Sequence, residues 1–225
     1  MDSTLIFDLD GTLIDSRPAI IDAFAAALRK HHLEPRVPWP ALRIGPPLAV
    51  TLRELAGDVA PALIDALSAD FKAGYDSTGY RASRVFDGIP ELLAALRADG
   101  RACYLATNKR LHPTRLIIEH LGWQDHFVDV YALDRFTPAL PDKAAMLRRL
   151  LAEHDINPRQ AIYIGDTLED RQAATAAALA FVGVKWGYGH FPTGQPPPVD
   201  TPQDLLAHLR RFDTEFPSPA SPARE

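Results

Sequence analysis

Short apolar runs alternate along the chain with longer stretches in which apolar residues recur every three or four positions. The short runs predict strands and the longer stretches predict helices. The predicted strands are Thr4–Leu9, Arg101–Thr107, His126–Leu133, Gln160–Gly165 and Leu179–Lys185. The helices predicted between them are Ile89–Ala98, Pro113–Leu121, Asp142–His154 and Leu168–Ala178. Regular alternation of this kind is typical of an α/β fold with a mainly parallel sheet.

One interval departs from this alternation. Residues 16–84, between the first two predicted strands, contain little strand signal and several helical stretches. These stretches are Arg17–His32, Leu48–Gly57 and Ala60–Tyr75. Since a simple crossover between strands needs far fewer residues, we expect an inserted α-helical cap subdomain here. The α/β catalytic core would then comprise residues 1–15 and 85–213.

Proline marks the irregular segments. Several prolines between Glu34 and Val50 prevent a continuous helix, so a loop is expected inside the cap. A proline-rich loop, Phe191–Asp200, precedes a last predicted helix, Pro202–Phe212. Residues 214–225 are rich in proline, serine and charged residues, and a disordered tail is expected there.

The composition is that of an ordinary globular protein. Apolar residues make up 47% of the 225 residues and charged residues 24%, so there is enough apolar material for a sizeable core. The net charge is −5 and no long basic run occurs, so neither a nucleic-acid polymer nor a membrane is expected as a partner. The single cysteine, Cys103, and the lack of a signal-peptide pattern lead us to expect a cytoplasmic location.

Polar side chains follow the ends of the predicted strands. They are Asp8 and Asp10 after the first strand, Thr107, Asn108 and Lys109 after the second, Lys143 after the third, and Asp166 and Asp170 after the fourth. Ligands of an open parallel sheet bind beyond the carboxyl ends of its strands. Carboxylates gathered there repel one another unless a cation lies between them. Their hard oxygen atoms favour Mg²⁺, which also accepts phosphate oxygens as ligands.

Four motifs follow one another in the order found in a known superfamily. They are DLDGTLIDS (8–16), LATNK (105–109), PDKAAML (141–147) and GDTLEDRQAA (165–174). With them the chain, from Leu5 to about Gly189, resembles the haloacid dehalogenase superfamily. IGPPL (44–48) and GVKWGYG (183–189) are similar to stretches of its phosphoglycolate phosphatase-like branch. The resemblance implies a Rossmann-like parallel-sheet core with an inserted α-helical cap.

The resemblance also implies an enzyme, a phosphatase that hydrolyses a small phosphorylated metabolite with Mg²⁺ as cofactor. Asp8 would attack phosphorus and form an aspartyl-phosphate. Asp10 would act as general acid and then as general base. Thr107 and Lys143 would bind the phosphoryl oxygens. Many relatives carry a Lys-Pro pair at the third motif, whereas here the lysine stands in LPDKAAM.

Further residues complete the implied site. The metal would be held by the Asp8 carboxylate, the Asp10 backbone carbonyl, Asp166 and Asp170. Asn108 and Arg43 are candidate substrate-binding residues. Lys109 follows the end of its strand by two residues. We therefore expect its side chain either to contact the site residues without binding substrate or metal itself, or to face solvent.

Several interpretations stay open. Phosphoglycolate is the substrate that the resemblance suggests, but nucleotidases, pyrophosphatases and sugar phosphatases share the pattern, and a phosphosugar mutase would use the same core. In another functional class, a phospho-receiver signalling module also groups aspartates, a threonine and a lysine around Mg²⁺, although it is shorter and has no helical insert. The chain is expected to be a monomer or a small homo-oligomer.

Structural roles compete with some of these assignments. Asp166 would suit the N-cap of the helix that follows it. Asp170 could be an exposed charge paired with Arg171, and Arg43 could be a solvated loop residue. The sequence by itself leaves these alternatives open.

Overall fold

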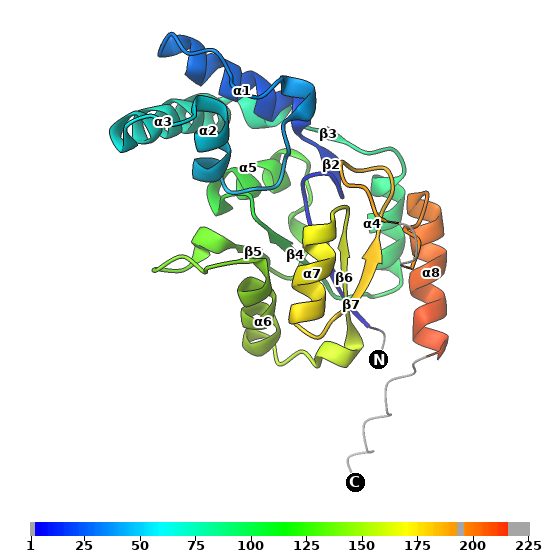
Figure 1. Cartoon of the computed structure of the whole chain (residues 1–225). Coiled ribbons are helices and arrows are strands. Elements are labelled where there is room, and N and C mark those ends of the chain that lie inside the picture. Colours follow the sequence, from blue (N-terminus) through cyan, green and yellow to red (C-terminus); the bar gives the residue numbers. More distant parts are fainter. Residues whose placement is uncertain (1–2, 193–195, 216–225) are drawn as a thin grey trace.

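The structure, a computed structural model, describes residues 3–192 and 196–215. Its centre is a parallel sheet with the strand order β5–β4–β1–β6–β7 (Figure 1). The strands are β1 (Thr4–Phe7), β4 (Cys103–Thr107), β5 (Val130–Ala132), β6 (Ala161–Gly165) and β7 (Ala180–Gly183). β1 pairs with β4 on one side and with β6 on the other, so the first strand of the chain lies in the middle of the sheet. The predicted α/β fold is confirmed.

Helices cover both faces of this sheet. They are α4 (Ile89–Ala98), α5 (Leu111–His120) and α8 (Pro202–Glu215) on one face, and α6 (Lys143–Glu153) and α7 (Leu168–Ala176) on the other. The alternation of side chains along β1 explains the two layers, because Leu5 and Phe7 pack on the first face and Ile6 packs on the second. Both faces are therefore buried, as is usual for a parallel sheet.

Three helices lie together beyond one end of the sheet (Figure 1). They are α1 (Arg17–Lys30), α2 (Leu48–Ala56) and α3 (Pro61–Ser77). Phe24 of α1 packs against Phe71 of α3 with ring centroids 4.5 Å apart, and α2 contributes the buried Leu52 and Leu55. These helices thus share apolar contacts with one another and form a group at the end of the sheet, whose buried residues continue the hydrophobic core on the α4, α5 and α8 face.

A short antiparallel pair connects this group to the core. β2 (Ile14–Asp15) pairs with β3 (Arg84–Val85), and Asp15 lies opposite Arg84. The chain therefore leaves the core and returns to it at adjacent points, next to the predicted boundaries at residues 16 and 84. The division into core and cap stays a prediction, and we call residues 16–84 the cap below.

The predicted elements differ from the observed ones mainly at their ends. The apolar run His126–Leu133 forms a strand only at Val130–Ala132, because its ends, His126 and Leu133, belong to 3-10 helices and residues 127–129 are irregular. α8 continues to Glu215, three residues beyond the predicted helix end, and residues 216–225 of the predicted tail lie outside the described residues. Of the helices described, none combines the length and the apolarity that crossing a membrane requires.

Candidate active site

Three carboxylates meet beyond the carboxyl ends of two adjacent strands. Asp8 directly follows β1, and Asp166 and Asp170 follow β6. The pairing of these strands extends to the site, since the Asp8 backbone N–H donates to the carbonyl of Ile164 at 2.9 Å. One oxygen of each carboxylate lies within 4.8 Å of the others, and all three side chains are buried. The structure therefore brings together three of the predicted metal-binding residues.

Lys143 supplies positive charge to this cluster from the first turn of α6. Its Nζ lies 3.1 Å from Oδ1 of Asp8 and 2.5 Å from Oδ1 of Asp170. Asp142 caps the helix by accepting the N–H of Ala145 at 2.7 Å, which fixes where the helix starts. Burial opposes the charged ammonium, but the carboxylates of Asp170 and Asp8 raise the pKa of Lys143 well above its ordinary value. Lys143 is thus a fixed cation beside Asp8.

A capping box at the start of α7 orients Asp170. Its Oδ2 accepts hydrogen bonds from the backbone N–H and the hydroxyl of Thr167, and its own N–H donates to the Thr167 hydroxyl oxygen. The N-cap of α7 is therefore Thr167, and the N-cap interpretation of Asp166 is wrong. Asp170 is buried and bonded to Lys143, so its interpretation as an exposed partner of Arg171 is also wrong.

The loop after β7 wraps around Asp166. Oδ2 of Asp166 accepts the backbone N–H groups of Tyr188 at 2.7 Å and Gly189 at 3.3 Å. Gly11 has φ +85°, and a Cβ there would lie 2.3 Å from the same carboxylate oxygen. A Cβ at Gly187 would lie 2.4 Å from Cβ of Asp166. The glycines therefore let two loops approach this carboxylate from opposite ends of the sequence.

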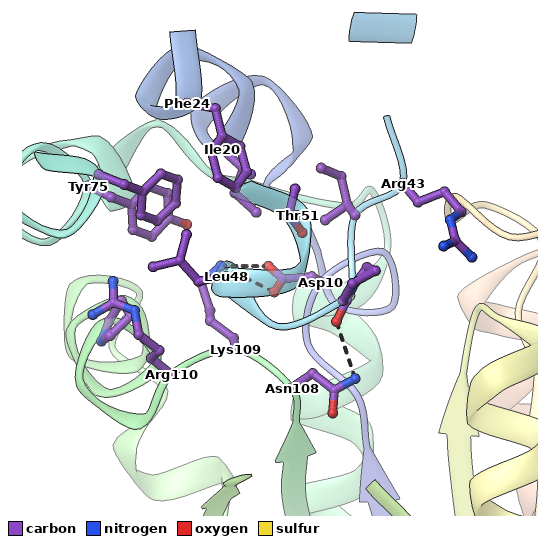
Figure 2. A pocket seen from close by; sticks show the side chains of 15 residues that line it. Asp10, Ile20, Phe24, Arg43, Leu48, Thr51, Tyr75, Asn108, Lys109 and Arg110 are labelled. Carbon is purple, nitrogen blue, oxygen red and sulfur yellow. Dashed lines mark hydrogen bonds and ion pairs between the residues drawn. The ribbon is translucent and has the colours of Figure 1, made fainter. Parts of the chain in front are cut away.

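Asp10 is held by a different cation, Lys109. Nζ of Lys109 lies 2.9 and 3.2 Å from the two oxygens of Asp10 (Figure 2). The Ser16 hydroxyl donates to the same carboxylate. The side chain of Lys109 is only 6% exposed, and its Nζ lies 4.8 Å from the ring centroid of Tyr75 in the cap. Of the two roles expected for Lys109, a position facing solvent is wrong, and its pairing with Asp10 agrees with the other, support of the site. The backbone N–H of Lys109 donates to the hydroxyl of Thr107 at 3.2 Å, so the chain turns directly after β4.

Tyr188 connects the carboxylate cluster of Asp8, Asp166 and Asp170 to the start of the cap. Its hydroxyl accepts the backbone N–H groups of Ser16 and Arg17 at 2.8 and 3.0 Å, and it donates to Asp15 at 2.9 Å. Its backbone N–H binds Asp166. Sequence reasoning did not identify this role, although the motif GVKWGYG contains the residue.

The remaining predicted residues lie around the cluster. Thr107 is buried at the end of β4, and the side-chain amide of Asn108 donates to the carbonyl of Gly45 in the cap at 3.2 Å (Figure 2). Arg43 is exposed and pairs with Glu169 at 3.4 Å. The substrate-binding roles of these three predicted residues stay predictions.

The electrostatics of the cluster are those of crowded carboxylates. Burial raises the pKa of Asp8 to about 8; Lys143 opposes the shift, and the carboxylates of Asp170 and Asp166 add to it. Burial and the Asp170 carboxylate raise the pKa of Asp166 to about 6. Without a further cation, the cluster therefore holds protons that isolated carboxyl groups would release.

A divalent metal ion fits this cluster. Oδ1 of Asp8 is buried and has no hydrogen-bond partner among the described residues, although Lys143 lies nearby. The available donors are carboxylate oxygens, which are the hard ligands that Mg²⁺ prefers. The Asp10 carboxylate binds Lys109 and stands outside the cluster, so the contribution of its backbone carbonyl stays a prediction.

Comparisons with known proteins agree with this geometry. Residues 5–184 match the family described as haloacid dehalogenase-like hydrolase. Similar proteins include tyrosine-protein kinase PtkA of Mycobacterium tuberculosis (36% identity over 189 residues), 5'-nucleotidase of Pseudomonas aeruginosa (32% over 186) and phosphoglycolate phosphatase of Photobacterium profundum (31% over 211). The alignments cover 82%, 82% and 90% of this chain and 62%, 83% and 90% of the relatives. The chain thus spans less than two thirds of the length of PtkA.

A solved structure extends the likeness to three dimensions. The predicted phosphoglycolate phosphatase from Haemophilus somnus matches with a TM-score of 0.81 at 25% identity, covering 92% of this chain and 97% of that one. The family match contains Asp8, Lys143, Asp166 and Asp170, the residues that the fold brings together. The chain therefore belongs to the haloacid dehalogenase-like hydrolases, with similarity to their phosphoglycolate phosphatase-like and PtkA-like members.

Proposed function

We propose that this hydrolase is a Mg²⁺-dependent phosphatase that hydrolyses a small phosphomonoester through an aspartyl-phosphate at Asp8. The observation that carries the proposal is the convergence of Asp8, Lys143, Asp166 and Asp170 beyond β1 and β6. A carboxylate nucleophile, a fixed cation and an acidic metal site are the groups that this type of phosphoryl transfer needs. The likeness to proteins named phosphoglycolate phosphatase and 5'-nucleotidase supports a phosphomonoester substrate.

The chemistry proceeds in two displacements at phosphorus. A carboxylate oxygen of Asp8 attacks phosphorus, the bond between phosphorus and the leaving oxygen breaks, and Asp10 gives its proton to that oxygen. Asp10 then takes a proton from a water molecule, which attacks the aspartyl-phosphate. Inorganic phosphate leaves and Asp8 returns to its carboxylate form. The ammonium of Lys143, 3.1 Å from Asp8, offsets the repulsion between the nucleophile and the phosphate dianion.

Asp8, Asp166, Asp170 and the Asp10 carbonyl would hold Mg²⁺, which would stabilise negative charge on the phosphoryl oxygens. The loop after β7 supports this assignment, because the N–H groups of Tyr188 and Gly189 keep one oxygen of Asp166 oriented. Thr107, buried at the end of β4, would donate its hydroxyl to a phosphoryl oxygen.

The cap would close the site against water. Tyr75 of the cap contacts Lys109 of the core, and Gly45 of the cap accepts a hydrogen bond from Asn108. These contacts support a lid that excludes bulk water from the aspartyl-phosphate and limits the size of the substrate.

The first prediction tests this chemistry. Purified protein with MgCl₂ should release phosphate from p-nitrophenyl phosphate, and EDTA should abolish the activity. Asp8→Asn should lower kcat by about 10³-fold or more, and Asp10→Asn should also lower it strongly, because each removes a group that acts on the reacting atoms. Asp125→Asn, at an exposed aspartate, serves as the matched control and should keep wild-type kinetics. Turnover by Asp8→Asn at the wild-type rate would contradict the nucleophile assignment, and activity in EDTA would contradict the metal assignment.

The similarity to PtkA favours a second candidate, transfer of the phosphoryl group to a protein hydroxyl in place of water. A labelled γ-phosphate of ATP that appears on tyrosine, with little free phosphate, would support this candidate. Phosphate release from phosphomonoesters without transfer would support the phosphatase. The phospho-receiver alternative has lost its support, because the family match covers residues 5–184.

A further inference from the structure

The loop after β7 holds the segment that joins β1 to α1. The indole N–H of Trp186 donates to the carbonyl of Thr12 at 2.9 Å. The hydroxyl of Tyr188 accepts the backbone N–H groups of Ser16 and Arg17 at 2.8 and 3.0 Å. The segment that follows the proposed general acid is therefore tied at two points to the loop that also orients a carboxylate of the proposed metal site.

Tyr188 takes over the capping of α1. The first N–H groups of a helix have no partner within the helix, and a serine at the N-cap usually accepts one of them through its hydroxyl. Ser16 occupies the N-cap of α1, but within the described part of the chain its side chain makes no capping hydrogen bond. The Tyr188 hydroxyl accepts two N–H groups there and donates to Asp15 at 2.9 Å, so both of its acceptor positions and its single donor are used.

The hydroxyl that Ser16 does not use for capping binds Asp10. It donates to Oδ1 of Asp10, and both residues are buried. Nζ of Lys109 donates to the same oxygen at 2.9 Å and to Oδ2 at 3.2 Å (Figure 2). Because Oδ1 already accepts hydrogen bonds from both groups, the proton that Asp10 transfers in the proposed mechanism would be carried by Oδ2. Ser16 and Lys109 thus determine which oxygen of Asp10 is available for the chemistry.

We propose that Tyr188 is a positioning residue for Asp10. By capping α1 in place of Ser16, it leaves the Ser16 hydroxyl on Oδ1 and keeps Oδ2 for the leaving oxygen. The backbone N–H of Tyr188 also binds Asp166 at 2.7 Å, so the same residue sets the distance between the acid/base and the proposed metal site. The inference rests on the proposed phosphatase function and adds a residue that does not itself touch the reacting atoms.

Tyr188→Phe tests the proposal, because it keeps the ring and the backbone N–H and removes only the hydroxyl. Without this cap, α1 draws the Ser16 hydroxyl back to the usual capping position and away from Asp10. The loss should depend on the leaving group. Phenolate, whose conjugate acid has a pKa of about 10, leaves with help from a proton, whereas the less basic p-nitrophenolate leaves without one.

We therefore expect kcat/KM, which reports the step that breaks the ester bond, to fall about tenfold more for phenyl phosphate than for p-nitrophenyl phosphate. A fall of equal size for the two substrates, or no fall, would overturn the proposal. Tyr131→Phe is the matched control, because its hydroxyl donates to Glu153 at the opposite end of α6 from Lys143. This control should keep the wild-type ratio of the two kcat/KM values.

Ser16→Ala tests whether Tyr188 acts through Ser16. It removes the hydroxyl that binds Asp10, so it should show the same selective loss with phenyl phosphate. The double variant Ser16→Ala/Tyr188→Phe should lose no more than either single variant, since both changes remove the same contact. Additive losses would overturn the route through Ser16.

Two measurements without turnover complete the test. Amide hydrogen exchange at Ser16 should become about tenfold faster in Tyr188→Phe, because the N–H loses its acceptor, and unchanged exchange would overturn the capping contact. The Mg²⁺-dependent rise in Tm should stay that of the wild type, because the N–H of residue 188 still binds Asp166. A diminished rise would place the effect in the metal site and overturn the proposal. Wild-type protein that hydrolyses neither aryl phosphate would refute the proposed function itself, whereas activity without the selective loss would refute only the role of Tyr188.

Discussion

Lys109 and Asp10 form a buried ion pair beside the proposed nucleophile. Their side chains are 6% and 8% exposed. Burial opposes the ammonium, yet the Asp10 carboxylate holds the pKa of Lys109 above its ordinary value. A buried pair adds little net stability, but removal of one partner leaves the other charge buried and unpaired. The pair therefore matters chiefly because it fixes where the Asp10 carboxylate lies.

We expect Lys109→Met to disturb both the chemistry and the fold. A misplaced Asp10 should lower kcat/KM by about 10²-fold, and the unpaired carboxylate should cost about 3–5 kcal/mol of unfolding free energy. Lys185→Met is the matched control, because Lys185 pairs with Asp200 at 2.6 Å on the exposed surface. Exposed pairs contribute about 0–1 kcal/mol, so this control should change little. Steady-state kinetics and thermal unfolding measure both effects, and equal kinetics in the two variants would contradict the role given to Lys109.

The raised pKa values of Asp8 and Asp166 predict how stability depends on pH in metal-free protein. These pKa values are about 8 and about 6 in the folded state, against about 3.9 for an aspartate in an unfolded chain. Between about pH 4 and pH 8 the folded state thus binds more protons than the unfolded state, and its stability falls as the pH rises.

In EDTA, the Tm of the wild type should fall between pH 5 and pH 8, and the Tm of Asp8→Asn should fall less, because the amide does not titrate. Added Mg²⁺ should raise the Tm at pH 8 more than at pH 5, since protons and metal compete for the same oxygens. Differential scanning calorimetry of both proteins at each pH measures these shifts. Parallel Tm profiles for wild type and Asp8→Asn would show that Asp8 carries no such shift.

At the residue scale, the motifs correctly place Asp8, Asp166 and Asp170 close together, because parallel strands bring their carboxyl ends to one edge of the sheet. The motifs do not predict where the Lys109 side chain lies. Its distance from a strand end is visible in the sequence, but its contacts with Asp10 and with Tyr75 of the cap join segments that lie far apart in the sequence. Contacts of that kind become visible only in three dimensions.

At the scale of elements, the loop that contains Gly11 and the loop after β7 both close on Asp166. Gly11→Ala would combine a strained φ of +85° with a Cβ 2.3 Å from the Asp166 carboxylate. Gly122→Ala is the matched control, because Gly122 has φ +69° and nothing within 4 Å of the added Cβ. A comparison of the two variants therefore separates backbone strain from displacement of the carboxylate.

The positive φ should lower the unfolding free energy of both variants by about 1–2 kcal/mol. The close approach to Asp166 should lower it substantially more in Gly11→Ala. In addition, Gly11→Ala should weaken Mg²⁺ binding by about tenfold, as changes beside a metal ligand commonly do. The Mg²⁺ concentration that half-saturates activity and the Mg²⁺-dependent rise in Tm provide two readouts. Equal Mg²⁺ affinity in the two variants would contradict the close packing of Gly11 on Asp166.

The limits of the elements are predicted better for some elements than for others. α4 occupies Ile89–Ala98, as predicted, because its apolar spacing and its flanking glycines mark both ends. The strand predicted as Arg101–Thr107 pairs only from Cys103, since apolar character reports burial and does not report hydrogen bonding to a neighbour. Strand limits are therefore set by partners that lie far away in the sequence.

At the scale of the whole molecule, three consecutive core residues contact the cap. Asn108 bonds to Gly45, Lys109 lies over Tyr75, and Arg110 makes a two-pronged ion pair with Asp76 at the end of α3. The length of the insert predicts that a cap exists, but these contacts pair residues from separate segments and leave no local signal in the sequence. Residues 108–110, which follow β4, therefore join the proposed active site to the cap.

Arg110→Met should therefore weaken the contact between core and cap and leave the proposed catalytic carboxylates unchanged. If the closed form binds substrate and the variant populates it less, the apparent affinity falls by the same fraction, so we expect KM to rise about five- to tenfold. Arg210→Met is the matched control, because Arg210 makes an equivalent two-pronged pair with Asp99 that joins two core helices away from the cap. Both pairs are partly exposed, so both variants should keep Tm within about 4 °C of wild type. A KM that rises in Arg110→Met and not in Arg210→Met would show that this contact between core and cap supports substrate binding, whereas equal KM values would show that this ion pair plays no part in it.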